Sequence, residues 1–273
     1  MATLEITDDA HEPASNPIDD SGRFVRQHYA DFLNREPDAP GLAFWTSEIE
    51  QCGADEQCKE VKRVNVSAAF FLSIEFQQTG YLVYRLDKVA FGNISAVRPV
   101  PLTLAEFLSD TQGIGQGVVV GATGWEERLE ANKRSFIDAF VLRTRFTSRY
   151  PNSTAPEAFV DSLNANAGGA LSQEERDALV ADMKGGAKTR AHVLRAVAEN
   201  ANVVRRESNQ AFVLMQYFGY LRRDPDAAPE PGLNFNGYAF WLGMLNEFNG
   251  NYIAAEMVKA FISSDEYRKR FGQ

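Results

Sequence analysis

The chain has 273 residues, of which 44% are hydrophobic, enough for a sizeable core in one large domain or two ordinary ones. Its 37 acidic residues outnumber the 28 Lys and Arg residues, and the net charge of -9 would repel a nucleic-acid backbone. No stretch has the roughly 18–20 uninterrupted apolar residues that a membrane-spanning helix needs. Composition therefore argues against nucleic acid as a partner and against a transmembrane segment.

The first residues, up to Asp20, are rich in Asp, Glu, Pro and Asn. They lack the basic segment and the following apolar run of a secretory signal. This composition predicts a disordered leader over residues 1–21. If the chain is a domain excised from a longer protein, the missing signal indicates nothing about its compartment.

A helix, a tight turn and a second helix are predicted next. Apolar residues from Phe24 to Leu33 recur at helical spacing along one face. Pro37 disfavours helix for the residue before it, and Asp38 can accept backbone hydrogen bonds, so the turn that begins at Arg35 is a stop signal. We expect Gly41 to add to this break.

Trp45 falls on the helix that follows the turn, where it shares a face with Leu42 and Ile49. A large aromatic residue with aliphatic neighbours at helical spacing is typical of a buried anchor. We therefore predict that Trp45 packs in the core.

Five residues separate Cys52 from Cys58, a spacing that can close a disulfide loop. A zinc site would need further ligands, and His11, His28 and His192 are scattered along the sequence. A disulfide is the favoured interpretation and two free thiols are the alternative. A disulfide would imply an oxidising compartment. We expect no metal and no cofactor.

Helical patterns continue through the middle of the chain. The glycines between Leu108 and Trp125 match neither nucleotide-binding spacing, so this stretch is predicted to be a flexible connector. A group of basic residues is interpreted as the solvated face of one helix: Arg128, Lys133, Arg134, Arg143, Arg145 and Arg149. Aromatic and apolar residues over 132–207 suggest a degenerate copy of the first motif as a further hypothesis.

The first motif returns near the end of the chain. The segment from Phe212 to Asp226 repeats the pattern of residues 24–38, with the second loop longer than the first. The repeated motif positions are Arg35, Pro37, Asp38, Gly41 and Trp45 in the first copy and Arg223, Pro225, Asp226, Gly237 and Trp241 in the second.

These patterns predict an all-α fold, a multi-helix domain built from a duplicated helix-turn-helix repeat. We divide the chain into the leader 1–21, the first repeat with its connector 22–131, the central segment 132–207 and the second repeat 208–273. Each copy has few helices of its own, so we expect one compact unit.

No nucleophile elbow, zinc-protease helix or cysteine-histidine pair is present. Carboxylates that are distant in sequence can still meet as a general acid and base, so an enzyme stays an alternative. The acids of the two turns are interpreted as turn stabilisers, because an EF-hand loop needs alternating acids and a terminal Glu. Tyr29 and Tyr217 are candidate ligand contacts, since a phenol prefers one hydrated end.

The segments Leu33 to Asp38, Gly41 to Trp45 and Ser73 to Phe76, with their counterparts in the second copy, resemble the family called domain of unknown function 4214. The resemblance covers about residues 22–78 and 208–271, with Asn34 and Arg222 in place of the usual turn glycine. It implies an all-helical module of large secreted or surface-associated bacterial proteins, without catalytic residues. The turn is also distantly similar to the linker domains of phycobilisomes, an analogy that favours protein binding.

We therefore expect a non-catalytic interaction or structural module of a secreted or cell-surface bacterial protein, with a protein or a surface glycan as its partner. Carbohydrate (exopolysaccharide) binding, an enzyme that uses dispersed carboxylates and an intracellular scaffold are the alternatives. The expected location is extracellular or at the cell surface, as part of a larger protein, and a cytoplasmic location stays open.

Overall fold

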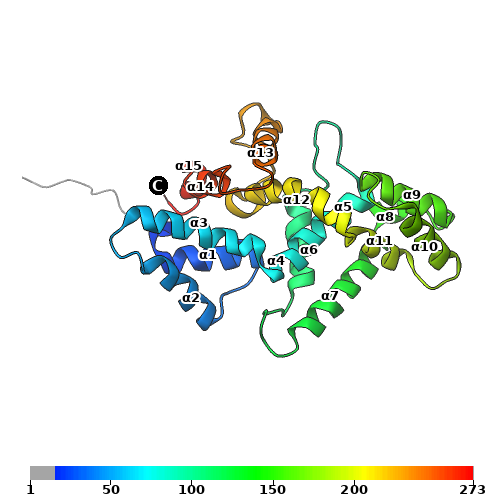
Figure 1. Ribbon diagram of the computed structural model, residues 1–273, viewed down its shortest axis with the longest axis horizontal. Coiled ribbons are helices and arrows are strands. Elements are labelled where there is room, and N and C mark those ends of the chain that lie inside the picture. Colours follow the sequence, from blue (N-terminus) through cyan, green and yellow to red (C-terminus); the bar gives the residue numbers. More distant parts are fainter. Residues whose placement is uncertain (1–15, 273) are drawn as a thin grey trace, which may run out of the picture.

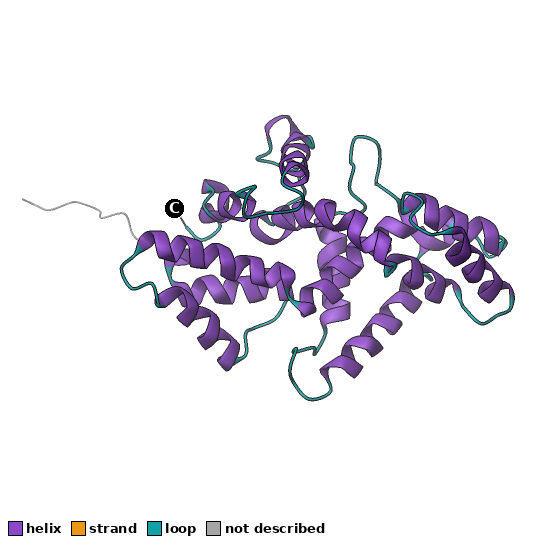
Figure 2. Ribbon diagram, in the orientation of Figure 1, coloured by secondary structure: helices purple, strands orange, loops and turns teal. Residues whose placement is uncertain are grey.

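The computed structural model describes residues 16–272, and all regular elements in this range are helical (Figure 1, Figure 2). The α-helices are α1 (Ser21–Leu33), α2 (Ala39–Glu50), α3 (Glu56–Leu72), α4 (Ile74–Gln78), α5 (Gly80–Phe91), α6 (Leu104–Gly115), α7 (Trp125–Phe140), α8 (Thr144–Arg149), α9 (Pro156–Asn166), α10 (Gln173–Lys184), α11 (Arg190–Ala198), α12 (Ala201–Gln216), α13 (Asn236–Glu247), α14 (Met257–Ile262) and α15 (Asp265–Lys269). The predicted all-α class is confirmed. None of these helices is both long and apolar enough to cross a membrane.

Helices α5 and α12 lie in the middle of the molecule. Figure 1 shows α1, α2 and α3 at one end and α8 to α11 at the other, with α5, α6 and α12 between them. Helix α5 contacts α4, α6, α9, α11 and α12. It is therefore buried almost all round, charged Arg85 and Asp87 included, as expected for a helix with neighbours on every side.

The two copies of the motif pack against each other. Helix α14 lies against α3, and the single-turn π-helix η2 (Tyr217–Leu221), which continues α12, lies against α1. One hydrophobic cluster joins buried residues from Ile18 to Tyr267. The contacts thus connect the first and last thirds of the chain.

The leader is shorter than predicted. Residues 1–15 lie outside the described part of the chain, but Asn16 and Ile18 are buried and residues 17–19 form a short 3-10 turn. Asp19 forms a bidentate ion pair with Arg268, at 2.7 and 2.9 Å. The expectation of disorder is wrong for residues 16–21, because Ile18 is buried, the 3-10 turn packs against α1, and Asp19 binds Arg268.

The predicted connector is also shorter, because α6 continues to Gly115 and only residues 116–124 between α6 and α7 are non-helical. The expected basic helix is two helices, α7 and α8. Arg128, Arg134 and Arg149 are exposed as expected, but Lys133 is buried. Arg143 is not simply solvated, because it forms a bidentate pair with the buried Asp110, at 2.7 and 2.8 Å. Arg145 bonds to Glu106 at 3.1 Å. These pairs join α8 to α6.

His28 is a core residue of α1. Its ring lies among aromatic neighbours, with Phe24 at 4.2 Å and Phe70 at 5.4 Å between ring centroids. Nδ1 lies 2.8 Å from the Phe24 carbonyl oxygen, which can only accept, so Nδ1 carries the proton and Nε2 accepts from the Ser67 hydroxyl. Burial lowers the pKa of His28 to about 3, so the imidazole is neutral in the folded chain.

Folding stability should therefore fall as the pH decreases from about 6.5 towards 3, since only the unfolded chain binds a proton at this imidazole in that window. Between pH 7 and pH 4 the loss due to His28 should be about 3 kcal/mol. Urea unfolding at several pH values checks this, with His28→Gln compared to the parent chain. The exposed His192 offers the control: His192→Gln should keep the parent slope, and an unchanged slope in His28→Gln would contradict the assignment.

Candidate functional site

The first motif forms a compact ion-pair centre. Arg35 donates from Nε and Nη2 to the two carboxylate oxygens of Glu75 in α4, at 2.8 and 2.9 Å. The Glu75 side chain is buried, and the Arg35 guanidinium lies 4.9 Å from the centroid of the Tyr29 ring in α1. Because Arg35 follows α1 directly, this pair joins the end of α1 to α4.

The second motif has the same contacts. Arg223 donates from Nε and Nη2 to Glu266 in α15, at 2.6 and 3.1 Å, and lies 5.2 Å from the centroid of the Tyr217 ring. The residue before each arginine, Asn34 or Arg222, adopts the left-handed conformation with φ of 53° or 56°. The predicted turn is thus present at both positions, and common descent of the two copies stays a prediction.

The acidic residues of the turns have different roles. Asp38 caps α2 by accepting from the Gly41 amide at 2.8 Å, after Pro37. In the longer second loop, Glu230 accepts from the Gly237 amide at 3.2 Å instead. Asp226, one residue after Pro225, accepts from Arg98 at 3.2 Å. The interpretation of Asp226 as a local turn stabiliser is therefore wrong, because the inserted residues bring Glu230 to the capping position.

Gly41 does not break a helix, contrary to our expectation. It lies in the first turn of α2, and Gly237 lies in the first turn of α13. A Cβ atom on Gly41 would overlap the Tyr29 hydroxyl oxygen, and one on Gly237 would lie 2.7 Å from the Tyr217 hydroxyl oxygen. Both positions need glycine because each tyrosine packs directly against the helix backbone.

Tyr29 and Tyr217 are themselves buried, with Arg35 and Arg223 over their rings. The expected hydrated end of each phenol faces a glycine backbone. This arrangement favours packing over ligand contact for both residues. Tyr29 lines a cavity together with Trp45.

Trp45, which we expected to pack in the core, and its counterpart Trp241 are partly buried and pack against the hydrophobic core. Trp45 packs on Phe70 at 6.1 Å, and Trp241 packs on Phe261 at 5.5 Å. Each indole also makes an edge contact with the preceding phenylalanine. Phe44 lies 4.9 Å from Trp45 and Phe240 lies 5.1 Å from Trp241. The indoles thus lie at the core boundary, each beside a phenylalanine.

Cys52 and Cys58 form a disulfide between the end of α2 and the first turn of α3, with their Cα atoms 5.5 Å apart. Asp55 caps α3 inside the closed loop by accepting from the Cys58 amide at 3.0 Å. The bond therefore holds the α2–α3 hairpin. It lies away from the two ion-pair centres in sequence.

The double variant Cys52→Ser/Cys58→Ser should lose about 2 kcal/mol of unfolding free energy, because closing a short loop restricts the unfolded chain only modestly. Urea denaturation measures the difference. The parent chain purified from the organism that encodes it, with free thiols alkylated on lysis, should show no alkylated cysteine in an intact-mass measurement. Two alkylated cysteines in that sample would contradict the bond.

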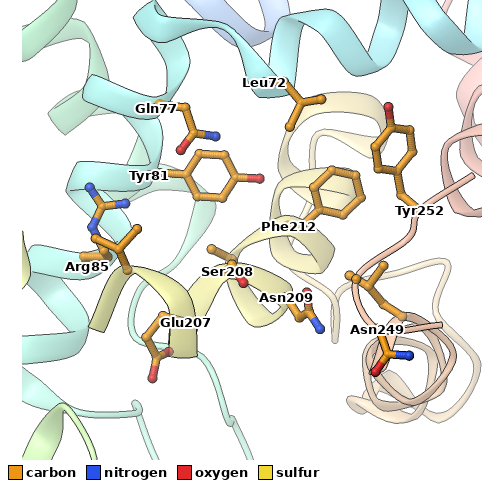
Figure 3. Close-up of a pocket in the computed structure, with 14 residues that line it drawn as sticks. Leu72, Gln77, Tyr81, Arg85, Glu207, Ser208, Asn209, Phe212, Asn249 and Tyr252 are labelled. Carbon is orange, nitrogen blue, oxygen red and sulfur yellow. The ribbon is translucent and has the colours of Figure 1, made fainter. Parts of the chain in front are cut away.

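A cavity of about 350 Å³ opens between α5, α12 and the loop after α13 (Figure 3). Apart from Phe212, the first residue of the second motif, no sequence motif pointed to its residues. Tyr81 and Arg85 of α5 line it and are only 5% and 7% exposed. Across the cavity, Tyr252 stacks on Phe212 with centroids 5.4 Å apart. The cavity thus combines buried polar groups with aromatic walls.

Arg85 is incompletely paired. Its Nε donates to the Ala198 carbonyl oxygen at 2.9 Å, and its terminal nitrogens have no hydrogen-bond or ion-pair partner within residues 16–272. Burial lowers the pKa of this guanidinium, and burial raises the pKa of the Tyr81 hydroxyl. Like those nitrogens, the Tyr81 hydroxyl has no partner in this part of the chain. A buried arginine whose terminal nitrogens lack a partner cannot be recognised from its neighbours in the sequence, so sequence analysis missed Arg85.

Comparisons with known proteins agree with the geometry of the first motif. Residues 14–79 match the family described as Domain of unknown function (DUF4214). This confirms the predicted resemblance for the first copy of the motif. A search of curated proteins and a search of solved structures found no significant match.

The Arg35–Glu75 ion pair should stabilise the folded chain. Arg35→Met should cost about 3 kcal/mol of unfolding free energy, because it leaves the buried Glu75 carboxylate without its counter-charge. Denaturant unfolding measures the loss. In the exposed pair Arg26–Glu36, Arg26→Met should cost less than about 1 kcal/mol. Equal losses in the two variants would contradict a structural role for Arg35.

Proposed function

We propose that this chain is a non-catalytic interaction module of a secreted or cell-surface bacterial protein, with two separate contact surfaces. The observation that carries the proposal is that the charged groups of the two motifs are paired within the chain, whereas two of their phenylalanines are exposed. The charged groups are satisfied internally, in the Arg35–Glu75 and Arg223–Glu266 pairs. Next to them, Phe44 and Phe240 are 55% and 58% exposed.

Exposed aromatic residues at equivalent positions favour binding over catalysis. Each phenylalanine rests on a partly buried tryptophan, which holds its ring in place and lowers the entropy lost on binding. Phe and Trp are among the residues enriched at protein interfaces. Helices α2 and α13, which carry the two pairs, lie on opposite sides of the molecule in Figure 1. Two such surfaces would allow bivalent attachment.

The Cys52–Cys58 bond supports the proposed location, since disulfides persist in oxidising compartments. A reducing cytosol would keep the two thiols free. Attachment to a protein or glycan of the cell envelope is therefore the form of interaction that we propose.

The labelled chain should bind saturably to cell envelopes isolated from the organism that encodes it. Phe44→Ser or Phe240→Ser should weaken this binding, and the double variant should weaken it by at least about tenfold, since aromatic anchors commonly contribute this much. Sedimentation of the envelopes with the labelled chain measures the affinity.

Leu142 provides the matched control because it is an exposed apolar residue outside both motifs. Leu142→Ser should bind like the parent chain. If the double variant also binds like the parent, the aromatic surfaces are not the attachment sites and the proposal fails.

Carbohydrate binding is a second candidate function. The observation that favours it is the cavity of Figure 3, which places hydroxyl, amide and guanidinium groups beside a stacked Phe212–Tyr252 pair. Sugar sites combine polar hydrogen-bonding groups with aromatic faces in this way. This cavity is independent of Phe44 and Phe240.

A further inference from the structure

We propose that the cavity between α5 and α12 binds a uronic-acid sugar unit whose carboxylate is held by Arg85. This inference rests on carbohydrate binding, the second candidate function, and names its ligand class and its central residue. It is independent of the two aromatic surfaces.

Arg85 differs from the other buried charged side chains in its ion pairing. Within residues 16–272, every other buried carboxylate or cation has an opposite charge within 4.0 Å: Asp31, Glu75, Asp87, Asp110, Lys133 and Glu207. Arg85 is the exception. A buried charge without a counter-ion is costly, and its terminal N–H groups also lack acceptors. An anion in the cavity would satisfy both needs.

The charge balance favours a carboxylate over a phosphate. One guanidinium neutralises one negative charge, and its planar fork matches the two oxygens of a carboxylate. The other charged group of the wall, Glu207, already accepts from the Tyr84 hydroxyl at 2.9 Å and lies 4.0 Å from the Lys88 ammonium. In Figure 3 its carboxylate points away from Arg85. A dianion would be under-compensated here.

The remaining walls favour a polyhydroxylated ring. The Tyr81 hydroxyl, between Arg85 and Phe212 in Figure 3, has no partner in the described range. Ser208 and Asn249 add a hydroxyl and an amide to the wall. Tyr252, only partly buried, supplies an aromatic edge at the far end. A cavity of about 350 Å³ is at the small end of ligand sites, which suits a single sugar unit.

Titration calorimetry and ligand-observed NMR with the full chain test the proposal. Galacturonate should bind with a dissociation constant on the order of millimolar, as expected for so small a ligand. Its neutral match, galactose, should bind at least about tenfold more weakly, since it lacks the charge-assisted bond. A trigalacturonate tests the source: tighter binding than the monomer indicates an acidic polysaccharide, and equal or weaker binding indicates a free sugar acid. Either result supports the uronate site.

Arg85→Gln should weaken galacturonate binding by about 10- to 100-fold. Because Arg85 is buried, Arg85→Gln could lose binding by unfolding the chain. A second variant at an exposed residue therefore tests the same site. Ser208 is exposed on α12 at the cavity wall, so Ser208→Trp should fill the cavity and also abolish binding while the melting temperature is kept. Ser148→Trp, at an exposed serine of α8, is the matched control and should bind like the parent.

Three results would overturn the proposal. Equal binding of galactose and galacturonate would leave carbohydrate binding intact but remove the role of the carboxylate. Galacturonate binding that survives both Arg85→Gln and Ser208→Trp would place the site elsewhere. Absence of binding by all three saccharides would remove the site and the carbohydrate function together. The envelope-binding assay with the Phe44 and Phe240 variants stays independent of these results.

Discussion

The positions of the helices in each motif depend on one arginine that holds one glutamate with two hydrogen bonds. Arg35 extends from the left-handed end of α1, crosses the Tyr29 ring and reaches Glu75 in α4. Because the Tyr29 hydroxyl lies against Gly41, the same contact also sets how closely α2 can approach. A single buried ion pair thereby orients three helices. Such a pair adds geometric specificity more reliably than net stability.

The second motif shows which parts of this arrangement can change. Its loop is longer, yet Arg223, Glu266, Tyr217 and Gly237 keep their mutual contacts. The cap is supplied by Glu230 from within the inserted segment. Asp226 is thereby released to bind Arg98, which lies between α5 and α6. A loop can become longer at a small cost in free energy, provided that the unpaired backbone amides in the first turn of the next helix find a hydrogen-bond acceptor.

Local signals in the sequence predict the elements but not their mutual packing. The Pro-Asp turn and the helical spacing around His28 were sufficient to predict α1, and the cysteine spacing was sufficient to suggest the loop that the bond closes. The role of Gly41 was not predictable, because it depends on a tyrosine in another helix. The cavity was missed for the same reason: Arg85 has meaning only beside α12, which follows in sequence more than a hundred residues later. Ile18 was a local signal that went unused, an apolar residue just before the acidic pair Asp19 and Asp20.

The unpaired Arg85 links ligand binding to the stability of the central contact. Helices α5 and α12 pack together in the middle of the molecule and belong to the first and last thirds of the chain. Any ligand that binds only the folded state stabilises it by RT ln(1 + L/Kd), where L is the free ligand concentration. An anion on Arg85 would act directly on this contact, because it would remove the cost of a buried charge in its wall. The second motif would then be held more firmly on the first when the cavity is occupied. Occupancy of the cavity would thus affect how rigidly α2 and α13, with their exposed phenylalanines, are placed relative to each other.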